Sequence, residues 1–305
     1  MKYIITGGFG FVGNEVCRQL LNSGNQVYIL DNGNRRAPQI DDISAAQVVN
    51  VDITNSKMVE EAFRKINPQC VIHLAAIHYI PECNADPCRT IAVNVDGTQA
   101  ILSAAAATSV ERVILASSGA VYADSNDPLA EDMLVKPVDI YGCSKLMTEQ
   151  LAELFHAQTG ITTITFRLFN VFGPRETNPH IIPEIINQLR KGNTLELGTI
   201  DTRRDFIFTE DVATGLIKFS TKPLKGHHIV NLASGNHASM RELISLIGEL
   251  TQREIKIVQD PSRLRKADKL VQVADLTKLR STLDWTPQMT LRKGLQKLLE
   301  FEKLI

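Results

Sequence analysis

The sequence predicts an α/β fold, in which helices cover both faces of a doubly wound parallel sheet and a smaller, mostly C-terminal α/β lobe follows. Three observations lead to this prediction. Short β-branched runs alternate with longer amphipathic stretches through the first half, a glycine-rich turn follows the first run, and the rhythm changes after Gly173-Pro174. Strand–helix alternation of this kind implies parallel strands joined by right-handed crossovers.

The expected elements follow from hydrophobic periodicity. Strands of the first half are expected at residues 3–6, 27–31, 48–51, 71–74, 113–117 and 163–166, and helices at 14–22, 56–66, 97–109 and 144–158. Beyond residue 173, helices are expected at 181–190, 240–250 and 291–303, and strands at 195–197, 228–232 and 255–258. We therefore expect a first domain over 1–172 that also takes in residues from about 205 to 235, with the second lobe over 173–305.

Composition and charge narrow the class of protein. The 305 residues carry 33 Lys and Arg against 34 Asp and Glu, a net charge of −1, which gives no overall attraction to nucleic acid or membrane. The apolar run at 2–5 is too short for a signal sequence or a membrane span. The five cysteines lack the paired spacing of a zinc site, and no metal is expected. A Cys83–Cys88 disulfide is conceivable, but reduced thiols in a cytoplasmic protein fit better.

A glycine-rich turn, TGGFGFVG at residues 6–13, joins the first strand to the first helix. Gly7, Gly10 and Gly13 permit a tight turn, the close approach of a pyrophosphate, and close packing of the helix on the strand. The helix N-terminus at Phe11 and Val12 offers free N–H groups and a partial positive charge to that anion. Because the turn lies between a strand and a helix, it predicts a dinucleotide site of the Rossmann type.

Two acidic residues end the second and third strands. Asp31 lies 31 − 13 = 18 residues beyond the last glycine, where a carboxylate can bind both ribose hydroxyls and repel a 2′-phosphate. This favours NAD over NADP, although Arg35 and Arg36 reduce that preference. Asp52 and Ile53 could bind an adenine ring. Asp52 could equally well cap the helix expected at 56–66, or the turn before it.

The pentapeptide Tyr141-Gly142-Cys143-Ser144-Lys145 places a phenol and an ammonium four residues apart, which is one face of a helix. A nearby cation lowers the pKa of a phenol from its usual value of about 10, so Lys145 and a bound nicotinamide can make Tyr141 a general base. Chance pairs of this spacing are common on solvated helices. Ser117 and Ser118 raise the prediction, because they end an apolar strand where open α/β sheets bind ligands.

The sequence now resembles the extended short-chain dehydrogenase/reductase family, in particular the NAD-dependent NDP-sugar epimerases and dehydratases. The motifs occur in the family's order: TGGxGFxG at 6–13, Asp31, Asp52-Ile53, HLAA at 73–76, NVDGT at 94–98, SSxxVY at 117–122, YxxxK at 141–145, RLFNVFGP at 167–174, RDFI at 204–207, NLASG at 231–235 and RKAD at 265–268. The resemblance covers nearly the whole chain and is more specific for the family than for the reaction.

The resemblance implies roles for individual residues. Ser118 would hydrogen-bond the reacting sugar oxygen, Tyr141 would be the acid/base, and Lys145 would bind the nicotinamide ribose. The substrate diphosphate would be met by Asn170, Arg204 and Arg265, since guanidinium groups match phosphate oxygens; Arg204 bonded to Asp205 or Asp211 as a fold element is the plainer alternative. NAD would be bound by Gly7, Gly10, Phe11, Val12, Gly13, Asp31, Asn32, Asp52, Ile53, Leu74, Ala75, Ala76, Asn94, Ser117, Tyr141 and Lys145.

The resemblance also bears on the reaction. Related dehydratases carry an Asp-Glu pair directly after the catalytic hydroxyl, where this chain has Gly119 and Ala120. Neither side chain can move a proton, which favours an epimerase, acting at C4 through a transient keto-sugar with tightly bound NAD that recycles the hydride. A dehydratase, an NAD(P)-dependent reductase, and more remotely a non-catalytic dinucleotide-binding module are the alternatives. The loop with His78, Glu82 and Cys83 departs from the common galactose epimerases, so the sugar stays open; a histidine packed beside Tyr79 is favoured over a proton donor.

The partners implied are a nucleotide-diphosphate sugar and a second copy of the chain. Family members pair the helix after Asn94 with the helix bearing Tyr141, and the alanines at 104–107 permit close helix approach. The same alanines fit packing on the sheet. No nucleic acid or membrane partner is expected.

Overall fold

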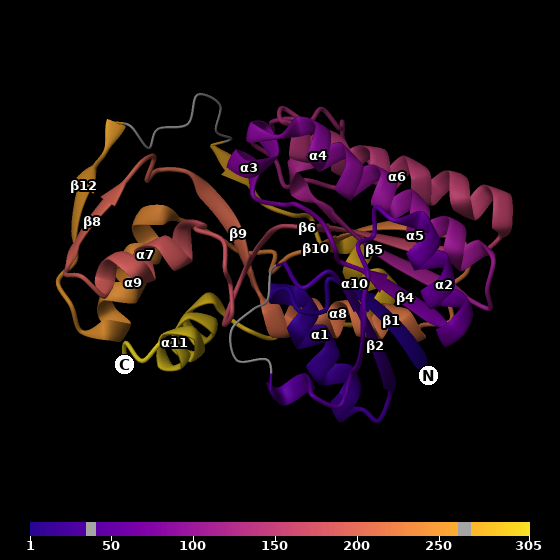
Figure 1. Cartoon of the computed structure of the whole chain (residues 1–305). Coiled ribbons are helices and arrows are strands. Elements are labelled where there is room, and N and C mark those ends of the chain that lie inside the picture. Colours follow the sequence, from indigo (N-terminus) through magenta and orange to yellow (C-terminus); the bar gives the residue numbers. More distant parts are fainter. Residues whose placement is uncertain (35–40, 262–269) are drawn as a thin grey trace.

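The structure, a computed structural model, describes residues 1–34, 41–261 and 270–305. It has two lobes side by side, with the N-terminus in the larger and the C-terminus in the smaller (Figure 1). The larger lobe contains a seven-stranded parallel sheet in the order β10-β6-β5-β4-β1-β2-β3. The strands are β1 (Lys2–Thr6), β2 (Gln26–Asp31), β3 (Gln47–Asn50), β4 (Cys70–His73), β5 (Arg112–Ser118), β6 (Thr162–Leu168) and β10 (His227–Leu232).

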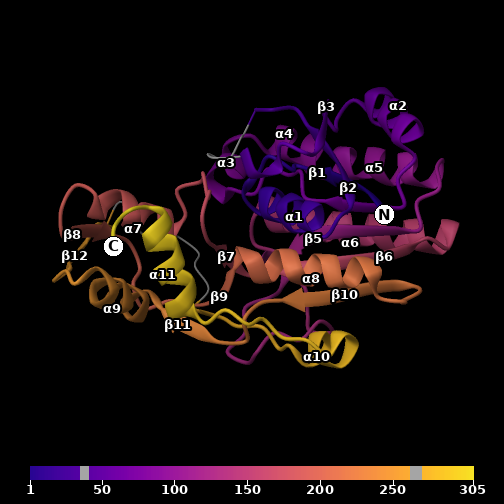
Figure 2. The same ribbon diagram turned by 90° about the horizontal axis from the view of Figure 1, so that it is seen from below.

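Helices cover both faces of this sheet, as the strand–helix alternation predicts. Alternate residues of β1 show why: Ile4 packs into one core, and Tyr3 and Ile5 into the other. One face is covered by α1 (Phe11–Asn22), α8 (Thr209–Thr221) and α10 (Thr277–Leu283), and the other by α2 (Ser56–Ile66), α5 (Gly97–Ala106) and α6 (Ile140–Thr159). Seen from below, α8 runs along β10 next to α1 (Figure 2). The predicted doubly wound fold is confirmed.

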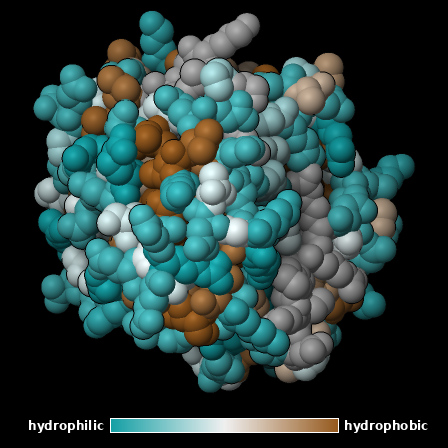
Figure 3. All heavy atoms as spheres, turned by 90° about the vertical axis from the view of Figure 1, so that its left-hand side faces the viewer, coloured by the Kyte–Doolittle hydropathy of each residue, from teal (hydrophilic) through white to brown (hydrophobic). Residues whose placement is uncertain are grey.

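The smaller lobe has its own core around two short sheets. In the first sheet β9 (Arg203–Phe208) pairs with β7 (Asn170–Phe172), β11 (His237–Ser239) and β13 (Val271–Gln272); in the second, β8 (Thr194–Leu197) pairs with β12 (Lys256–Gln259). The helices are α7 (Ile181–Leu189), α9 (Met240–Thr251) and α11 (Leu291–Phe301). The outer face of this lobe is mostly hydrophilic, with small apolar patches (Figure 3).

Short elements connect the larger lobe's strands and helices near the site. After β4 the chain forms α3 (Ile80–Ala85), α4 (Pro87–Ile91) and a π-helical turn (Ala92–Asp96) that runs directly into α5. Single 3₁₀ turns lie at Asp41–Ile43 and Gly119–Val121. Throughout the described ranges, no helix is both long and apolar enough to cross a membrane.

Candidate active site

A cavity of about 570 Å³ lies at the carboxyl ends of the parallel strands and extends to the smaller lobe. Open α/β sheets bind ligands at this edge, next to the point where the strand order reverses. In this sheet the reversal lies between β1 and β4. Most of the residues predicted for the site line this cavity: Gly7, Gly10, Phe11, Val12, Gly13, Asp31, Asn32, Asp52, Ile53, Leu74, Ala75, Ala76, Ser117, Ser118, Tyr141, Lys145, Asn170 and Arg204.

The glycine turn has the tight geometry that its sequence predicts. Gly7 has φ +67°, and its amide donates to the Leu30 carbonyl at 3.0 Å. Gly10 donates to the Gly7 carbonyl at 3.0 Å, and a Cβ on Gly13 would lie 2.1 Å from that same oxygen. The backbone of the turn is therefore closed on itself, with no side chain between the N-terminus of α1 and a bound anion. This cradle fits a pyrophosphate.

The acidic residues after β2 and β3 fix their own loops. Asp31 accepts hydrogen bonds from the amides of Phe9 at 3.2 Å and Gly33 at 2.8 Å, so its carboxylate lies over the glycine turn. Asp52 accepts from the Thr54 amide and hydroxyl, whose bonds outweigh burial and lower the pKa of this carboxyl. Asn55 caps α2, and Asp52 does not. The capping alternative for Asp52 thus holds only as a turn before the helix.

A chain of hydrogen bonds through His73 ties β1, β4 and the π-helical turn together. The Thr6 hydroxyl accepts from the Leu74 and Ala75 amides, both at 3.1 Å, so it must donate to His73 Nδ1 at 2.7 Å. The Thr98 hydroxyl donates to the Asn94 carbonyl and accepts from His73 Nε2 at 3.0 Å. Burial, with Lys145 nearby, lowers the pKa of His73 to about 3, so the ring is neutral and carries its proton on Nε2.

Asn94 departs from the sequence-based expectation that it lines a nucleotide site, and Ser117, which does line the cavity, has its hydroxyl bonded to another side chain. Asn94 does not line the cavity; its buried amide bonds both backbone groups of Ile77, at 2.8 and 2.9 Å, and donates to Ser144 at 2.9 Å. The Ser117 hydroxyl donates to Glu149, which forms a buried ion pair with Arg167 at 2.8 Å. Both side chains therefore hold neighbouring segments in position.

Ser118, Tyr141 and Lys145 meet at one wall of the cavity. Ser118 ends β5, and its hydroxyl accepts from the Ala120 amide at 3.1 Å. Helix α6 begins at Ile140, four residues before the predicted start, because the Asp139 side chain caps it by accepting from the Gly142 amide at 2.8 Å. Tyr141 is thus in the first turn. A Cβ on Gly142 would lie 2.9 Å from the Ala120 carbonyl, so glycine lets α6 approach the segment after Ser118.

In the structure the surroundings of Tyr141 favour its protonated form, whereas the sequence predicts a general base once nicotinamide is bound. Burial raises the pKa of Tyr141 to about 12, and the Ser118 hydroxyl only partly opposes it. Burial lowers the pKa of Lys145 to about 8; its ammonium donates to the Ala116 carbonyl at 2.9 Å and lies 5.9 Å from the centre of the Tyr141 ring. Without a second positive charge, the phenol therefore keeps its proton.

Residues 119 and 120 bring no ionisable side chain to this wall. A Cβ at Gly119 would lie 3.0 Å from Gln272 Nε2 and 3.4 Å from the Phe169 ring, which leaves little room for an acid. Ala120 lines the cavity with a methyl group. The arrangement supplies one acid/base group next to one hydroxyl.

The phosphate-contacting residues are placed in part. Asn170 begins β7 and Arg204 lies on β9, both at the cavity. The proposed fold partners of Arg204 have other bonds: Asp205 accepts from Ser234, Gly235 and Ala274, and Asp211 accepts from the amides of Gln288 and Met289. Arg265, with Arg35 and Arg36, lies outside the described residues.

Residues 3–233 match the NAD dependent epimerase/dehydratase family. The chain belongs to this family. The resemblance stated from the motifs is confirmed, and with it the expectation of an NAD-dependent enzyme. Of the five cysteines none forms a disulfide: Cys83 is buried and Cys88 exposed, both as free thiols.

Curated relatives within the family differ in their reactions. GDP-6-deoxy-D-mannose reductase of Pseudomonas aeruginosa is 33% identical over 76% of this chain and 79% of its own length. UDP-glucuronate 4-epimerase of Thermodesulfobacterium geofontis is 29% identical over 99% of this chain and 96% of its own. The crystal structure of UDP-glucose 4-epimerase from Thermotoga maritima with UDP-glucose has a TM-score of 0.92, 26% identity and 99% coverage of both chains.

The family motifs did not reveal one side-chain cluster at the cavity. His78 lies before α3, and Glu176, Asn178 and His180 lie between β7 and α7. His78 Nε2 is 2.9 Å from the side-chain nitrogen Nδ2 of Asn178, and the His78 ring is 5.7 Å from the His180 ring. The ring of Tyr79, the packing partner expected for His78, also lies 5.7 Å from the ring of His180. Only the pairing of distant segments brings these groups together, so no local signal could have found them.

Proposed function

We propose that this family member is an NAD-dependent epimerase of a nucleotide-diphosphate sugar, acting at C4. The observation that carries the proposal is the meeting of Ser118, Tyr141 and Lys145 at the cavity, next to Gly119 and Ala120, which carry no group that transfers a proton. Because Gly119 and Ala120 place no acid directly after Ser118, the simplest chemistry at this wall is oxidation of the sugar followed by return of the same hydride. Relatives of nearly the same length are named 4-epimerases.

Each side chain has a defined task in this proposal. The Tyr141 oxygen accepts the proton of the sugar hydroxyl, the Ser118 hydroxyl donates to the same sugar oxygen, and the Lys145 ammonium favours the phenolate. Bound NAD would supply a hydride acceptor and donor next to this wall of the cavity. Arg204 and Asn170, with Arg265, would hold the diphosphate. The glycine turn, Asp31 and Asp52 would bind the adenosine half, and Asp31 favours NAD over NADP.

The test is to incubate the purified protein with UDP-, GDP-, CDP- and dTDP-sugars, reading products by proton NMR and reduced nicotinamide by absorbance. An epimeric mixture without net cofactor turnover is expected. A keto-deoxy product would contradict the proposal, because elimination needs a second acid/base group. The variant Y141F should stay folded and lose epimerisation, because it keeps the buried ring and lacks the oxygen that accepts the proton.

A second candidate is a nucleotide-sugar reductase, favoured by the 33% identity to the Pseudomonas aeruginosa reductase. A reductase also needs only one acid/base group, so the side chains at 119 and 120 fit it too. The two differ in the cofactor: a reductase exchanges it and consumes NADH or NADPH stoichiometrically with a 4-keto sugar. Such consumption, in an assay supplied with a nucleotide-linked 4-keto sugar and NADH or NADPH, would select this candidate.

The organisation of the chain belongs to the same proposal. Residues 1–172 with about 205–235 would bind the dinucleotide, because β10 completes the sheet next to β6, and the remaining part of 173–305 would bind the nucleotide sugar. The family pairing of helices predicts a homodimer, supported by Met147 and Leu154, which are 45% and 53% exposed on one face of α6. Free thiols favour the cytoplasm.

A further inference from the structure

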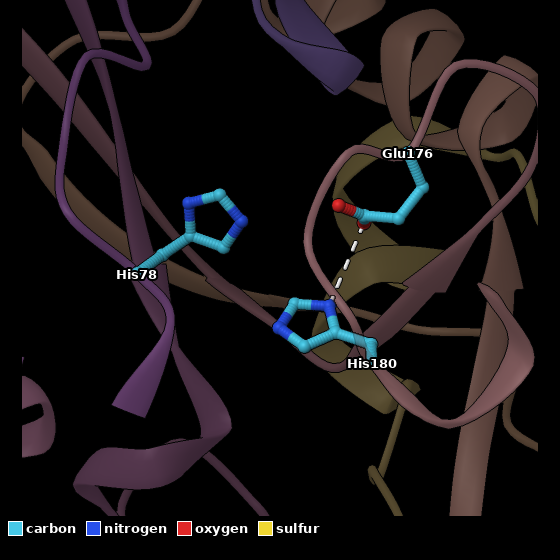
Figure 4. Close-up of side chains that lie close together, drawn as sticks. All are labelled: His78, Glu176 and His180. Carbon is cyan, nitrogen blue, oxygen red and sulfur yellow. Dashed lines mark ion pairs between the residues drawn. The ribbon is translucent and has the colours of Figure 1, made fainter. Parts of the chain in front are cut away.

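We propose that His78, Glu176 and His180 bind one divalent transition-metal ion, of which Zn²⁺ is the best match, at the junction of the two lobes. Their side chains point toward one another across the cavity (Figure 4). One ligand atom from each residue lies within 4.8 Å of both others. The site does not depend on the proposed reaction, and it can be tested without a sugar.

The donor set matches the chemistry of zinc. Two imidazoles and one carboxylate are the three-ligand set of many zinc sites that keep a fourth position open, with metal–ligand distances of about 2.0–2.2 Å. Tetrahedral ligand atoms at such distances are separated by about 3.3–3.6 Å. His180 Nδ1 and Glu176 Oε2 are already 3.5 Å apart, and the other two separations, which are at most 4.8 Å, would shorten as the His78 side chain moves toward this pair.

The surroundings favour an ionised carboxylate and a fixed ring. The Glu176 side chain is 6% exposed, and although burial raises its pKa, the bonds from His180 and the Asn178 amide lower it overall. That amide donates to Oε1 at 3.0 Å, so Oε2 is left facing His180. The Asn178 side chain contacts His78 Nε2. His78 would exchange this contact for a bond to the ion.

The position of the three residues gives the ion a mechanical role. His78 follows β4 in the larger lobe, whereas Glu176 and His180 belong to the segment that leads into α7 of the smaller lobe. An ion bound by all three would link the two walls of the cavity and present its open position to whatever ligand lies there. Bound metal should therefore stabilise the native protein against unfolding.

The experiment uses tag-free, EDTA-treated wild-type protein titrated with Zn²⁺ by calorimetry and with Co²⁺ by visible absorption. We expect one equivalent per chain, a raised melting temperature, and d–d bands without a thiolate charge-transfer band. The cobalt form should show paramagnetically shifted, exchangeable N–H signals from two histidines. Binding should weaken as the pH is lowered, since protonated imidazole cannot bind metal.

The variants H78Q, E176Q and H180Q should each lower the affinity by more than about tenfold. The matched control is H237A, which removes an exposed histidine on β11 and should bind one equivalent as the wild type does. Melting temperatures in EDTA check the folding of each variant. The proposal is overturned if the wild type binds no ion, if the three variants bind as the wild type does, or if a thiolate band places the ion on a cysteine.

Discussion

The phenol of Tyr141 is the group on which the proposed chemistry depends, and its surroundings favour the protonated form. Burial raises the pKa to about 12, and a positive charge placed nearby lowers a phenol pKa by about 1–3 units. We therefore predict that Tyr141 does not ionise below pH 10.5 in the nucleotide-free protein. When NAD⁺ is added, its ionisation should begin below pH 10.5. The measurement is the ultraviolet difference titration of wild type minus Y141F. Ionisation of Tyr141 below pH 10 without NAD⁺ would contradict it.

His73 predicts a pH dependence of stability. Its pKa is about 3 in the folded protein and 6.5 in its ordinary state, so between these values the unfolded chain binds a proton that the folded chain does not. Stability from the neutral ring is thus complete above pH 6.5 and falls as the pH is lowered toward 3, by roughly 1.4 kcal/mol per pH unit.

The measurement for His73 is urea unfolding of the wild type and H73Q between pH 7.5 and 5. H73Q should be less stable at pH 7.5, by about 1–3 kcal/mol for each buried hydrogen-bonding group left unpaired. It should also lose less stability than the wild type as the pH falls. Parallel curves for the two proteins would show that the ring is protonated in the folded state.

At the scale of elements, the glycine turn makes the sharpest prediction. In G13A the new methyl group would lie 2.1 Å from the Gly7 carbonyl, so the turn must move away from α1 and the anion cradle is lost. We expect the affinity for NAD to fall by at least about tenfold, which is 1.4 kcal/mol. The control is G192A, where the added Cβ would meet nothing within 4 Å. Equal NAD affinities, measured by calorimetry, would exclude a role for this close approach.

The elements show where sequence reasoning succeeds and where it stops. The central strands of the larger sheet were predictable because they are largely buried apolar runs, such as Val71 and Ile72 in β4, whereas the edge strand β3 is mostly exposed and was predictable from its β-branched Val48 and Val49. Helix α8 has no counterpart among the sequence-based predictions because Thr209, Thr214, Gly215 and Thr221 have low helix propensity, and packing against α1 and the strands β5, β7 and β9 stabilises it. The strands β7 and β9 have no counterpart either, because their residues belong to the motifs at 167–174 and 204–207, which were assigned to ligand contacts, and because their pairing is non-local.

The same contrast applies to the site. Tyr141 and Lys145 were found because one helix turn relates them, and the glycine turn because its residues are contiguous. The positioning role of Asn94 depends on a π-helical turn and on Ile77, 17 residues away, which no periodicity reveals. The cluster of His78 and His180 needs two lobes to meet, so it appears only in three dimensions.

The whole molecule has unequal ends, and this difference leads to the prediction of assembly. The end formed by α6 exposes Met147 and Leu154, which lie seven residues apart and therefore on the same face of the helix. Of the four alanines at 104–107, in contrast, Ala104 and Ala105 are buried in the chain's own core. The opposite end, with β8 and β12, is mostly hydrophilic (Figures 1 and 3). Leucine and methionine on one exposed helix face favour a helix-to-helix interface.

We predict that the wild type is a dimer of about twice the 33.8 kDa chain mass and that M147E/L154E is a monomer. Two carboxylates on the pairing face of α6 would have to be desolvated opposite their symmetry mates, which opposes association. The control is V258E on β12, where an equally exposed apolar residue, 49% accessible, lies at the far end of the molecule and should leave the dimer intact. Light scattering with size exclusion measures all three masses. If V258E alone dissociates the protein, the interface lies on the smaller lobe, and α6 is a free surface.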